Sequence, residues 1–387
     1  MNSDPVLPDV PADLAALNRS GPLRGVRVLE IAGVGPGPFC AMMLGDMGAD
    51  VVRVERAGAE APVLPINPLA NVLHRGRRTI TLDLKDRDNV ERVLDLVEQA
   101  DVLLEGYRPG VMERLGLGPE LCLDRNPALI YARMTGWGQD GPMAHLAGHD
   151  INYFAQSGAL WMSGREGEVP LPNLNMVSDM GGGGMLMAFG IACAIAEVRR
   201  SGQGQVIDAA MTEGTALLSA MIHGYRAMDR WVDRRGSNLL DGGAHFYNVY
   251  ETADGGFMAV GSIEAKFYAS LLDGLGLDPA DLPKQGDRTA WPALRTRFAE
   301  LFRQRTREEW TSVFASRDAC VTPVLTPDEA IAHPHAQARG MFGELAGVTQ
   351  PMPAPRFSRT PPGIVSPPPA EDLPFEQILE GWRQKRD

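Results

Sequence analysis

The sequence predicts an α/β fold, and two observations carry that prediction. Apolar runs of strand length alternate with helical segments from Gly21 onward, which is typical of a parallel sheet covered by helices. Further along, residues 246–263 hold two alternating runs around Asp254-Gly255-Gly256, a pattern that predicts a β-hairpin. The chain of 387 residues is long enough for two domains. We therefore expect a Rossmann-like large domain and a smaller α+β domain.

The elements follow one another in a regular order along the first half of the chain. A helix is expected after the first strand, and DRDNVERVLDLVEQA has apolar residues at helical spacing. The expected strands are VRVLEIAG, with its core at 27–33, then VVRVER, DVLLE, ALIYARMTG and GQVIDAAM at 204–211. The expected domains are a flexible N-terminal arm (1–20), a large α/β domain (21–205), a linker helix (206–235), a small α+β domain (236–318), and a return to the large domain with a proline-rich tail (319–387).

Composition narrows the classes of partner. The net charge of -12 argues against nucleic acid or an anionic membrane, because the field of the protein would repel both. The four cysteines form no CxxC pair, so neither a zinc site nor a disulfide framework is predicted. The acidic N-terminus does not resemble a signal peptide, and we expect a cytoplasmic protein.

Residues 180–198, MGGGGMLMAFGIACAIAEV, are apolar over about the length that crosses a bilayer. This stretch is single, lies in mid-chain and begins beside Asp179. A buried helix is therefore predicted in preference to a membrane span.

A glycine-rich turn after the first strand, Gly33-Val34-Gly35-Pro36-Gly37-Pro38, invites comparison with the dinucleotide-binding fingerprint. The third glycine of that fingerprint would fall at Pro38, so a nicotinamide enzyme is not expected. The helix start after the glycines remains a candidate for receiving an anion or a carbonyl oxygen.

Arginines gather in the segments that follow the predicted strands. Loops at the carboxyl ends of parallel strands are where ligands bind in α/β sheets. Single arginines there are usually solvated, but as a group on an acidic chain they favour a large phosphorylated ligand. These arginines are Arg53, Arg56, Arg75, Arg77, Arg78, Arg108 and Arg114.

Two polar segments contain the candidate acid–base residues. In AGHDINY, His149 follows His145 by four residues, but the glycine and the polar turn around them argue against a metal-binding helix. Asp179 opens the glycine-rich helix, where it is either the N-cap, together with Ser178, or a base beside free N–H groups. The four glycines after it would let a ligand approach the backbone.

Several segments in order resemble the family III CoA-transferase superfamily, and most closely its α-methylacyl-CoA racemases. They are GVRVLEIAGVGPGPFCAMMLGDMGADVVRVER, LDLKD, EGYRPGVMERLGLGPE, ARMTGWGQDGP, AGHDINY and DAAMTEG. The similarity covers nearly the whole chain, from about Gly21 to the PRFSR segment near 358.

The resemblance implies two acid–base residues, His149 and Asp179, with Glu264 orienting the histidine. It implies an acyl-CoA thioester as substrate and an interlocked homodimer as the assembly, and no metal or nicotinamide cofactor. The implied CoA-binding residues are Arg56, Leu82, Asp83, Leu84, Lys85, Gly106, Tyr107, Arg108, Arg114, Gly148, Asp150, Ile151, Asn152 and Tyr153.

The chemistry of α-carbon inversion agrees with that pair, because one residue must remove a proton and another must return one to the opposite face. The enolate formed between these steps also needs hydrogen-bond donors. We expect these donors to be N–H groups at the start of the 179–200 helix, with Asn175. The alternative is a CoA transferase in which Asp179 attacks the thioester. Met176, Met180, Met185 and Met187 either line the acyl site or pack the core.

Overall fold

The computed structural model describes residues 20–58, 67–364 and 366–384. The predicted N-terminal arm, residues 1–20, lies outside this range except for Ser20. Two compact units make up the chain. The large unit comprises Met1–Ser157, Leu174–Leu218 and His335–Asp387, and the small unit comprises Gly158–Asn173 and Ser219–Pro334. The small unit thus contains a loop from the first half of the chain and begins well before residue 236.

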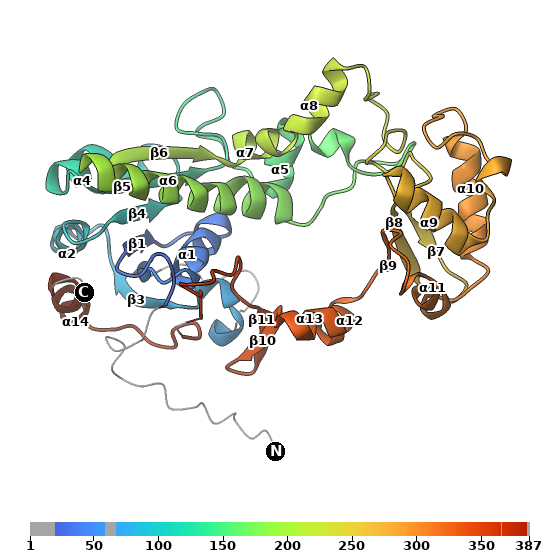
Figure 1. The fold of residues 1–387 in the computed structure, drawn as a ribbon. Coiled ribbons are helices and arrows are strands. Elements are labelled where there is room, and N and C mark those ends of the chain that lie inside the picture. The colour runs from blue at the N-terminus through green and yellow to red at the C-terminus, as the bar shows by residue number, and fades with distance from the viewer. Residues whose placement is uncertain (1–19, 59–66, 365, 385–387) are drawn as a thin grey trace. The chain divides into compact units, whose positions relative to one another are not determined.

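A six-stranded parallel sheet forms the centre of the large unit (Figure 1). Its order is β3-β2-β1-β4-β5-β6, the doubly wound order in which ligands bind where the order reverses, here between β1 and β4. This confirms the predicted α/β class. The strands are β1 (Arg27–Ile31), β2 (Asp50–Arg56), β3 (Arg77–Leu82), β4 (Val102–Glu105), β5 (Ile130–Thr135) and β6 (Gln205–Ala210).

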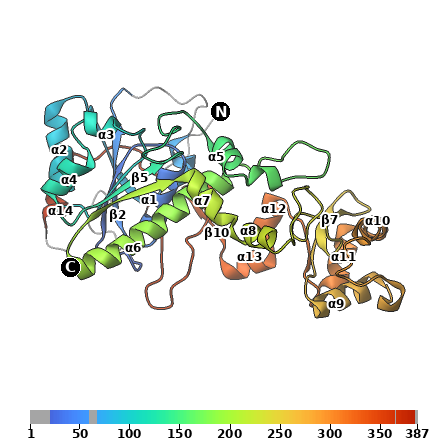
Figure 2. The ribbon, with the colours of Figure 1, turned by 90° about the horizontal axis from the view of Figure 1, so that it is seen from above.

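Helices cover both faces of this sheet (Figure 2). One face packs α2 (Arg87–Val97), α4 (Pro119–Arg125) and the C-terminal helix α14 (Phe375–Arg383). The other packs α1 (Pro36–Asp46) and α6 (Leu186–Ser201). The shorter elements of the large unit are η2 (Pro68–Ala70), η3 (Val72–His74), α3 (Val111–Arg114), α5 (Asp150–Gln156) and α7 (Met211–Leu218).

The apolar stretch around residues 180–198 forms two joined helices. It begins as a π-helix, η5 (Met176–Met185), and continues as α6. Met187, Ile191, Ala194 and Ile195 of α6 are buried in the core, whereas Phe189 is 67% exposed. Length and composition alone would let Met176–Ser201 cross a membrane, the one such helix in the described part of the chain. The predicted buried helix is therefore buried on one face only.

The small unit has its own core and a three-stranded antiparallel sheet, β7-β8-β9. The predicted hairpin is confirmed, because Tyr247–Glu251 and Phe257–Gly261 pair on either side of Asp254-Gly255-Gly256. Its other elements are η4 (Leu160–Met162), α8 (Ala220–Ala227), α9 (Ala265–Leu275), η6 (Pro279–Asp281), α10 (Trp291–Phe302), α11 (Arg307–Phe314), β9 (Val321–Pro323) and α12 (Pro327–Ala332).

From Pro334 onward, the described part of the C-terminal segment, predicted as a return to the large domain with a proline-rich tail, contains two strands and two helices. After α13 (Pro334–Arg339), strands β10 (Phe342–Leu345) and β11 (Val348–Pro351) form a second hairpin. Helix α14 then places Ile378, Leu379 and Trp382 in the core of the large unit. Burial of these apolar side chains stabilises the fold, so this segment completes the large unit.

Candidate active site

A cavity of about 460 Å³ lies at the carboxyl ends of β1, β4 and β5 in the large unit. Its walls come from the carboxyl ends of these strands with the segments that follow them, 30–38, 104–109 and 134–137, and from the loop 144–149 with Tyr153 of α5. Asp179 of η5 and Met211 of α7 complete the lining. The cavity occupies the point at which the strand order reverses, where ligands bind in sheets of this order.

His149 and Asp179 both line this cavity, so segments 30 residues apart bring the two predicted acid–base residues to one site. His149 is the N-cap residue of α5, and its backbone N–H donates to the Asn152 side chain at 3.0 Å. The Tyr153 hydroxyl donates to the Gly148 carbonyl. These contacts fix the loop and leave the His149 side chain exposed.

Close packing around the same loop favours glycine at position 148. A Cβ at this position would lie 2.7 Å from the Tyr153 ring and 2.9 Å from the Trp137 ring, closer than real Cβ contacts allow. The two rings meet edge to face, with centroids 4.8 Å apart, a favoured aromatic geometry. The loop that carries His149 is thus clamped between backbone and aromatic side chains.

Asp179 lies inside η5 and is not its N-cap, which is Asn175. Burial raises the pKa of Asp179 to about 6, helped by the nearby charge of Asp150, while His149 and an Asn175 hydrogen bond act in the opposite direction. Gly35, with φ of 69°, faces the carboxylate, since a Cβ there would lie 3.4 Å from Asp179 Oδ2. π-Helical turns are frequent at functional sites, and this one sets a half-buried carboxyl against the cavity.

The predicted oxyanion donors at the start of this helix are already occupied. The N–H groups of Ser178 and Asp179 both donate to Asp150 Oδ2 at 2.8 Å, and that of Met180 donates to the Asn175 carbonyl at 3.2 Å. The prediction is therefore wrong for the N–H groups of Asp179 and Met180, because the protein satisfies them itself.

The four glycines after Asp179 pack against protein and do not open the backbone to a ligand. A Cβ on Gly182 would lie 2.7 Å from the Thr215 nitrogen, one on Gly183 would lie 2.8 Å from Met211 Cγ, and one on Gly184 would lie 2.7 Å from Phe39 Cδ1. The sequence interpretation was wrong on this point. The glycines let η5 pack closely against α1 and α7.

The predicted CoA-binding residues fall into three groups. Gly106, Tyr107, Arg108, Gly148 and Tyr153 line the cavity. Four polar positions, Arg56, Asp83, Lys85 and Arg114, are exposed outside its lining, as are Ile151 and Asn152, and Arg56 acts electrostatically on Tyr107. The other three are buried, Leu82 and Leu84 in the apolar core and Asp150 beneath η5.

Glu264 belongs to the small unit, where it is the exposed N-cap residue of α9.

Of the four methionines, Met187 is fully buried in the core, whereas Met176 and Met185 are more than half exposed. Core packing therefore accounts for Met187. In the described part of the chain, no group of three His, Cys, Asp or Glu side chains is placed to hold a metal ion.

Buried ion pairs beneath the cavity are the feature that the sequence interpretation missed. Glu30 of β1 pairs with Arg53 and Arg77, and Arg53 Nη2 also donates to the Gly33 carbonyl at 3.1 Å. Glu105 of β4 pairs with Arg133 at 3.0 Å and accepts the Tyr107 N–H at 2.7 Å. A lone charge inside each apolar strand, facing an arginine on the next strand, is the signal that would have found these pairs.

The same pairs change the interpretation of the arginines that follow the strands. Arg53, Arg75, Arg77 and Arg78 are buried and bind the carboxylates of Glu30, Glu55, Asp46 and Asp50. Arg56, Arg108 and Arg114 remain exposed. The predicted arginine cluster is thus mostly structural, and three members are left to meet a phosphorylated ligand.

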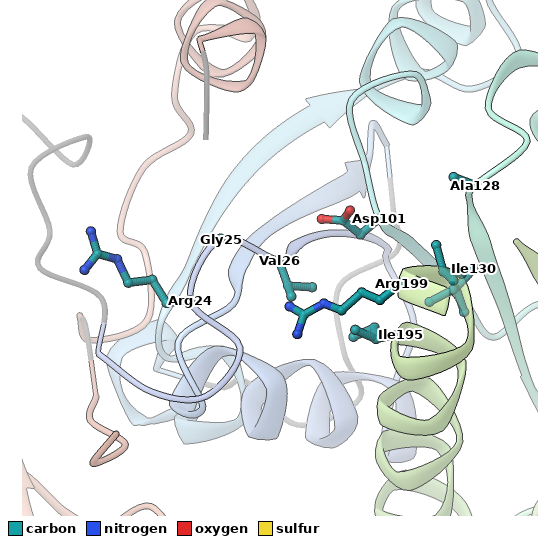
Figure 3. A pocket seen from close by; sticks show the side chains of 9 residues that line it. Arg24, Gly25, Val26, Asp101, Ala128, Ile130, Ile195 and Arg199 are labelled. Carbon is teal, nitrogen blue, oxygen red and sulfur yellow. The ribbon is translucent and has the colours of Figure 1, made fainter. Parts of the chain in front are cut away.

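A second cavity, of about 290 Å³, lies at the amino ends of the same strands (Figure 3). It is lined by Arg24, Asp101 and Arg199 together with small and apolar residues. Arg24 points away from the other labelled side chains in Figure 3. The charged groups of this second cavity do not converge, unlike those of the cavity that is lined by His149 and Asp179.

The chain matches the family model for CoA-transferase family III over residues 23–372. It is 52% identical over 342 residues to a protein of Mus musculus named alpha-methylacyl-CoA racemase, covering 88% of this chain and 87% of the relative. The protein of that name from Homo sapiens is 48% identical over 341 residues, with the same coverage. A CAIB/BAIF family protein from Brucella suis, solved by crystallography, superposes with a TM-score of 0.79 at 25% identity, covering 94% of this chain and all of that one. The chain belongs to CoA-transferase family III.

Proposed function

We propose that this protein is an α-methylacyl-CoA racemase, which interconverts (2R)- and (2S)-2-methylacyl-CoA thioesters. The observation that carries the proposal is the placement of His149 and Asp179 on the walls of one cavity. About half of the aligned residues are identical to those of relatives that are named for this activity. A CoA transferase needs the aspartate as nucleophile, but it has no evident use for the histidine.

The reaction divides between the two residues. In one direction the neutral imidazole of His149 takes the C2 proton, and the C2–H electrons move into the thioester to give an enolate. The protonated carboxyl of Asp179 then gives its proton to the other face of C2, which leaves an imidazolium and a carboxylate. In the other direction the carboxylate of Asp179 is the base. A positioned base or acid contributes about 10²–10⁴-fold.

The enolate oxygen needs donors other than those of η5. The first N–H groups of a helix have no intrahelical partner, and those of Asp150 and Ile151 bond to nothing in the described part of the chain. They follow His149 directly, so we propose that they stabilise the enolate oxygen. One donor of this kind is worth about 10²–10³ in rate.

Binding of the CoA moiety orients the reacting C2 atom of the substrate in the cavity. Arg56, Arg108 and Arg114 are exposed guanidinium groups, which suit phosphate, and Gly106 with Tyr107 lines the cavity. Contacts far from C2 hold the reacting carbon in place and so contribute to the rate. Coenzyme A is part of the substrate in this proposal, and no further cofactor takes part.

The assembly that we propose is an interlocked homodimer. Large apolar side chains exposed on the large unit support it, because such surfaces mark interaction sites. They include Met185, Phe189, Leu217 and Leu218, each more than 50% exposed. Glu264 keeps its proposed role as the residue that orients His149 within the dimer.

Incubation of one enantiomer of a 2-methylacyl-CoA in D₂O tests the proposal. We expect deuterium at C2, measured by mass spectrometry, together with loss of optical purity. A free carboxylic acid is added in a parallel reaction. Transfer of CoA to that acid without C2 exchange would contradict the racemase and support the transferase.

A further inference from the structure

Asp150 is the buried neighbour of His149, and its carboxylate faces η5. Only 7% of the residue is exposed. Its Oδ2 accepts the backbone N–H groups of both Ser178 and Asp179 at 2.8 Å. Hydrogen bonds between N–H groups and a carboxylate are stronger than those between neutral groups. One oxygen atom therefore ties the helix that carries Asp179 to the helix that begins after His149.

The carboxylate of Asp150 also acts on the side chain of Asp179. Helix η5 packs against α1, α5, α6 and α7 and against strands β5 and β6. The charged or titratable groups that these elements turn toward Asp179 are Asp150, His149 and Tyr153. The contacts from α1 and α7 with the glycines of η5 come from uncharged residues, Pro36, Phe39, Cys40, Met211, Gly214, Thr215 and Leu218. Among the described residues, Asp150 is the negative group whose charge acts on Asp179, whereas Glu30 and Glu105, which also line the cavity, are paired with arginines.

We infer that Asp150 is a positioning residue for the reaction: its carboxylate holds the backbone of Asp179 in place, and its negative charge keeps a proton on Asp179 while His149 acts as base. This inference rests on the proposed racemase. The family resemblance implied that Asp150 contacts CoA, whereas in the structure its side chain accepts two backbone N–H groups of η5.

The reversibility of the reaction explains why this effect is useful. The free enzyme has two forms that differ in the position of one proton. The form that acts on one enantiomer carries the proton on the aspartate, and the form that acts on the other enantiomer carries it on the histidine. For a histidine–aspartate pair with ordinary pKa values of about 6.5 and 3.9, one form would outweigh the other about 400-fold. A raised aspartate pKa, such as the value of about 6 at Asp179, brings the two forms closer in free energy. Burial contributes most of that rise, and Asp150 adds to it.

Asp150→Asn separates the two parts of the inference, because an amide oxygen still accepts both N–H groups but carries no charge. We expect the variant to fold and to bind substrate with KM close to wild type. The acid limb of its kcat/KM profile should move to lower pH in both directions of reaction. At neutral pH, kcat/KM should fall roughly tenfold for each unit of that movement. Asp150→Ala leaves both N–H groups without an acceptor, and kcat should fall further.

A measurement without turnover keeps this test separate from the racemase proposal. The Asp179 carboxyl is titrated by ¹³C NMR in wild type and in Asp150→Asn, and it is assigned by its loss in Asp179→Asn. We expect a lower titration midpoint in Asp150→Asn. The matched control is Asp278→Asn, at the exposed N-cap of η6, which should leave both midpoint and profile unchanged. If Asp150→Asn leaves the midpoint and the acid limb in place, Asp150 has no electrostatic role and the inference is wrong.

Discussion

Asp179 is held in an environment that suits its chemistry better than it suits the stability of the fold. Burial and the charge of Asp150 both disfavour its ionised form. The carboxyl therefore takes up a proton more readily than an exposed aspartate does. This is what a group needs if it must serve as acid and as base near neutral pH, and it comes at a cost to the folded state.

That cost predicts that Asp179→Asn stabilises the protein at neutral pH. The pKa of Asp179 is raised to about 6 from 3.8, so between these values the folded state binds more protons than the unfolded state. The destabilisation is absent below about pH 4, grows as pH rises to 6, and is then constant. Because the group is partly exposed, we expect about 1 kcal/mol at pH 7.5. Urea unfolding of both proteins from pH 4 to 8 measures this difference. A variant that is less stable than wild type at pH 7.5 would contradict the assignment.

At the scale of the element, close packing of η5 sets the position of Asp179. Its glycines lie against Pro36 and Phe39 of α1 and against Met211 and Thr215 of α7. Protein interiors are filled at near-crystalline density, so an added methyl group must displace a neighbour. The helix that carries the acid–base residue is in this way fixed by contacts on two sides.

Gly183→Ala tests this packing. Its Cβ would lie 2.8 Å from Met211 Cγ and 3.0 Å from Pro36 Cβ, so we expect a loss of about 1–3 kcal/mol of stability and lower kcat. The control is Gly224→Ala in α8, where no atom lies within 4 Å of the added Cβ. That variant should be neutral or more stable by up to about 1 kcal/mol. Equal effects of the two substitutions in urea unfolding would rule out the packing role.

The whole molecule consists of two compact units with separate cores. The predicted acid–base pair and the cavity belong to the large unit, whereas Glu264 belongs to the small unit. Each unit carries part of the proposed site, and the homodimer is the arrangement that we propose to unite them. The oligomeric state therefore bears directly on the function.

We expect a mass of twice the 41.9 kDa of one chain in sedimentation equilibrium. Phe189→Glu places a charge on a side chain that is 67% exposed on α6, and it should lower the urea concentration at which the dimer dissociates. Leu121→Glu, on a residue that is 42% exposed on α4, is the matched control and should not. A single-chain mass for the wild type would contradict the proposed assembly.

Sequence patterns could predict the sheet, the hairpin and the candidate acid–base residues His149 and Asp179. These features depend on local periodicity and on recognisable sequence segments. The strand order places the carboxyl ends of β1, β4 and β5 side by side, as expected for a doubly wound fold. Helix α14 was not predicted, since its short amphipathic pattern follows a proline-rich stretch.

Partners far apart in the chain could not be predicted in the same way. The two N–H groups of η5 appeared free in the sequence, but Asp150, 28 residues away from Ser178, accepts both. The arginines Arg53 and Arg77 appeared to be ligand-binding residues, but both reach Glu30 across neighbouring strands. Each error arose because a polar group was interpreted as free, although the fold places a hydrogen-bonding or charged partner beside it.

The most direct test of the two-base mechanism determines which enantiomer each residue deprotonates. Single enantiomers of a 2-methylacyl-CoA are incubated in D₂O with His149→Ala and with Asp179→Asn, and exchange at C2 is followed separately from inversion. We predict that both variants lose racemisation by about 10²–10⁴-fold and still bind CoA. Each should exchange the C2 proton of one enantiomer only, and the two variants should choose opposite enantiomers. Racemisation at the wild-type rate in either variant, or exchange of the same enantiomer by both, would contradict a mechanism with two bases on opposite faces.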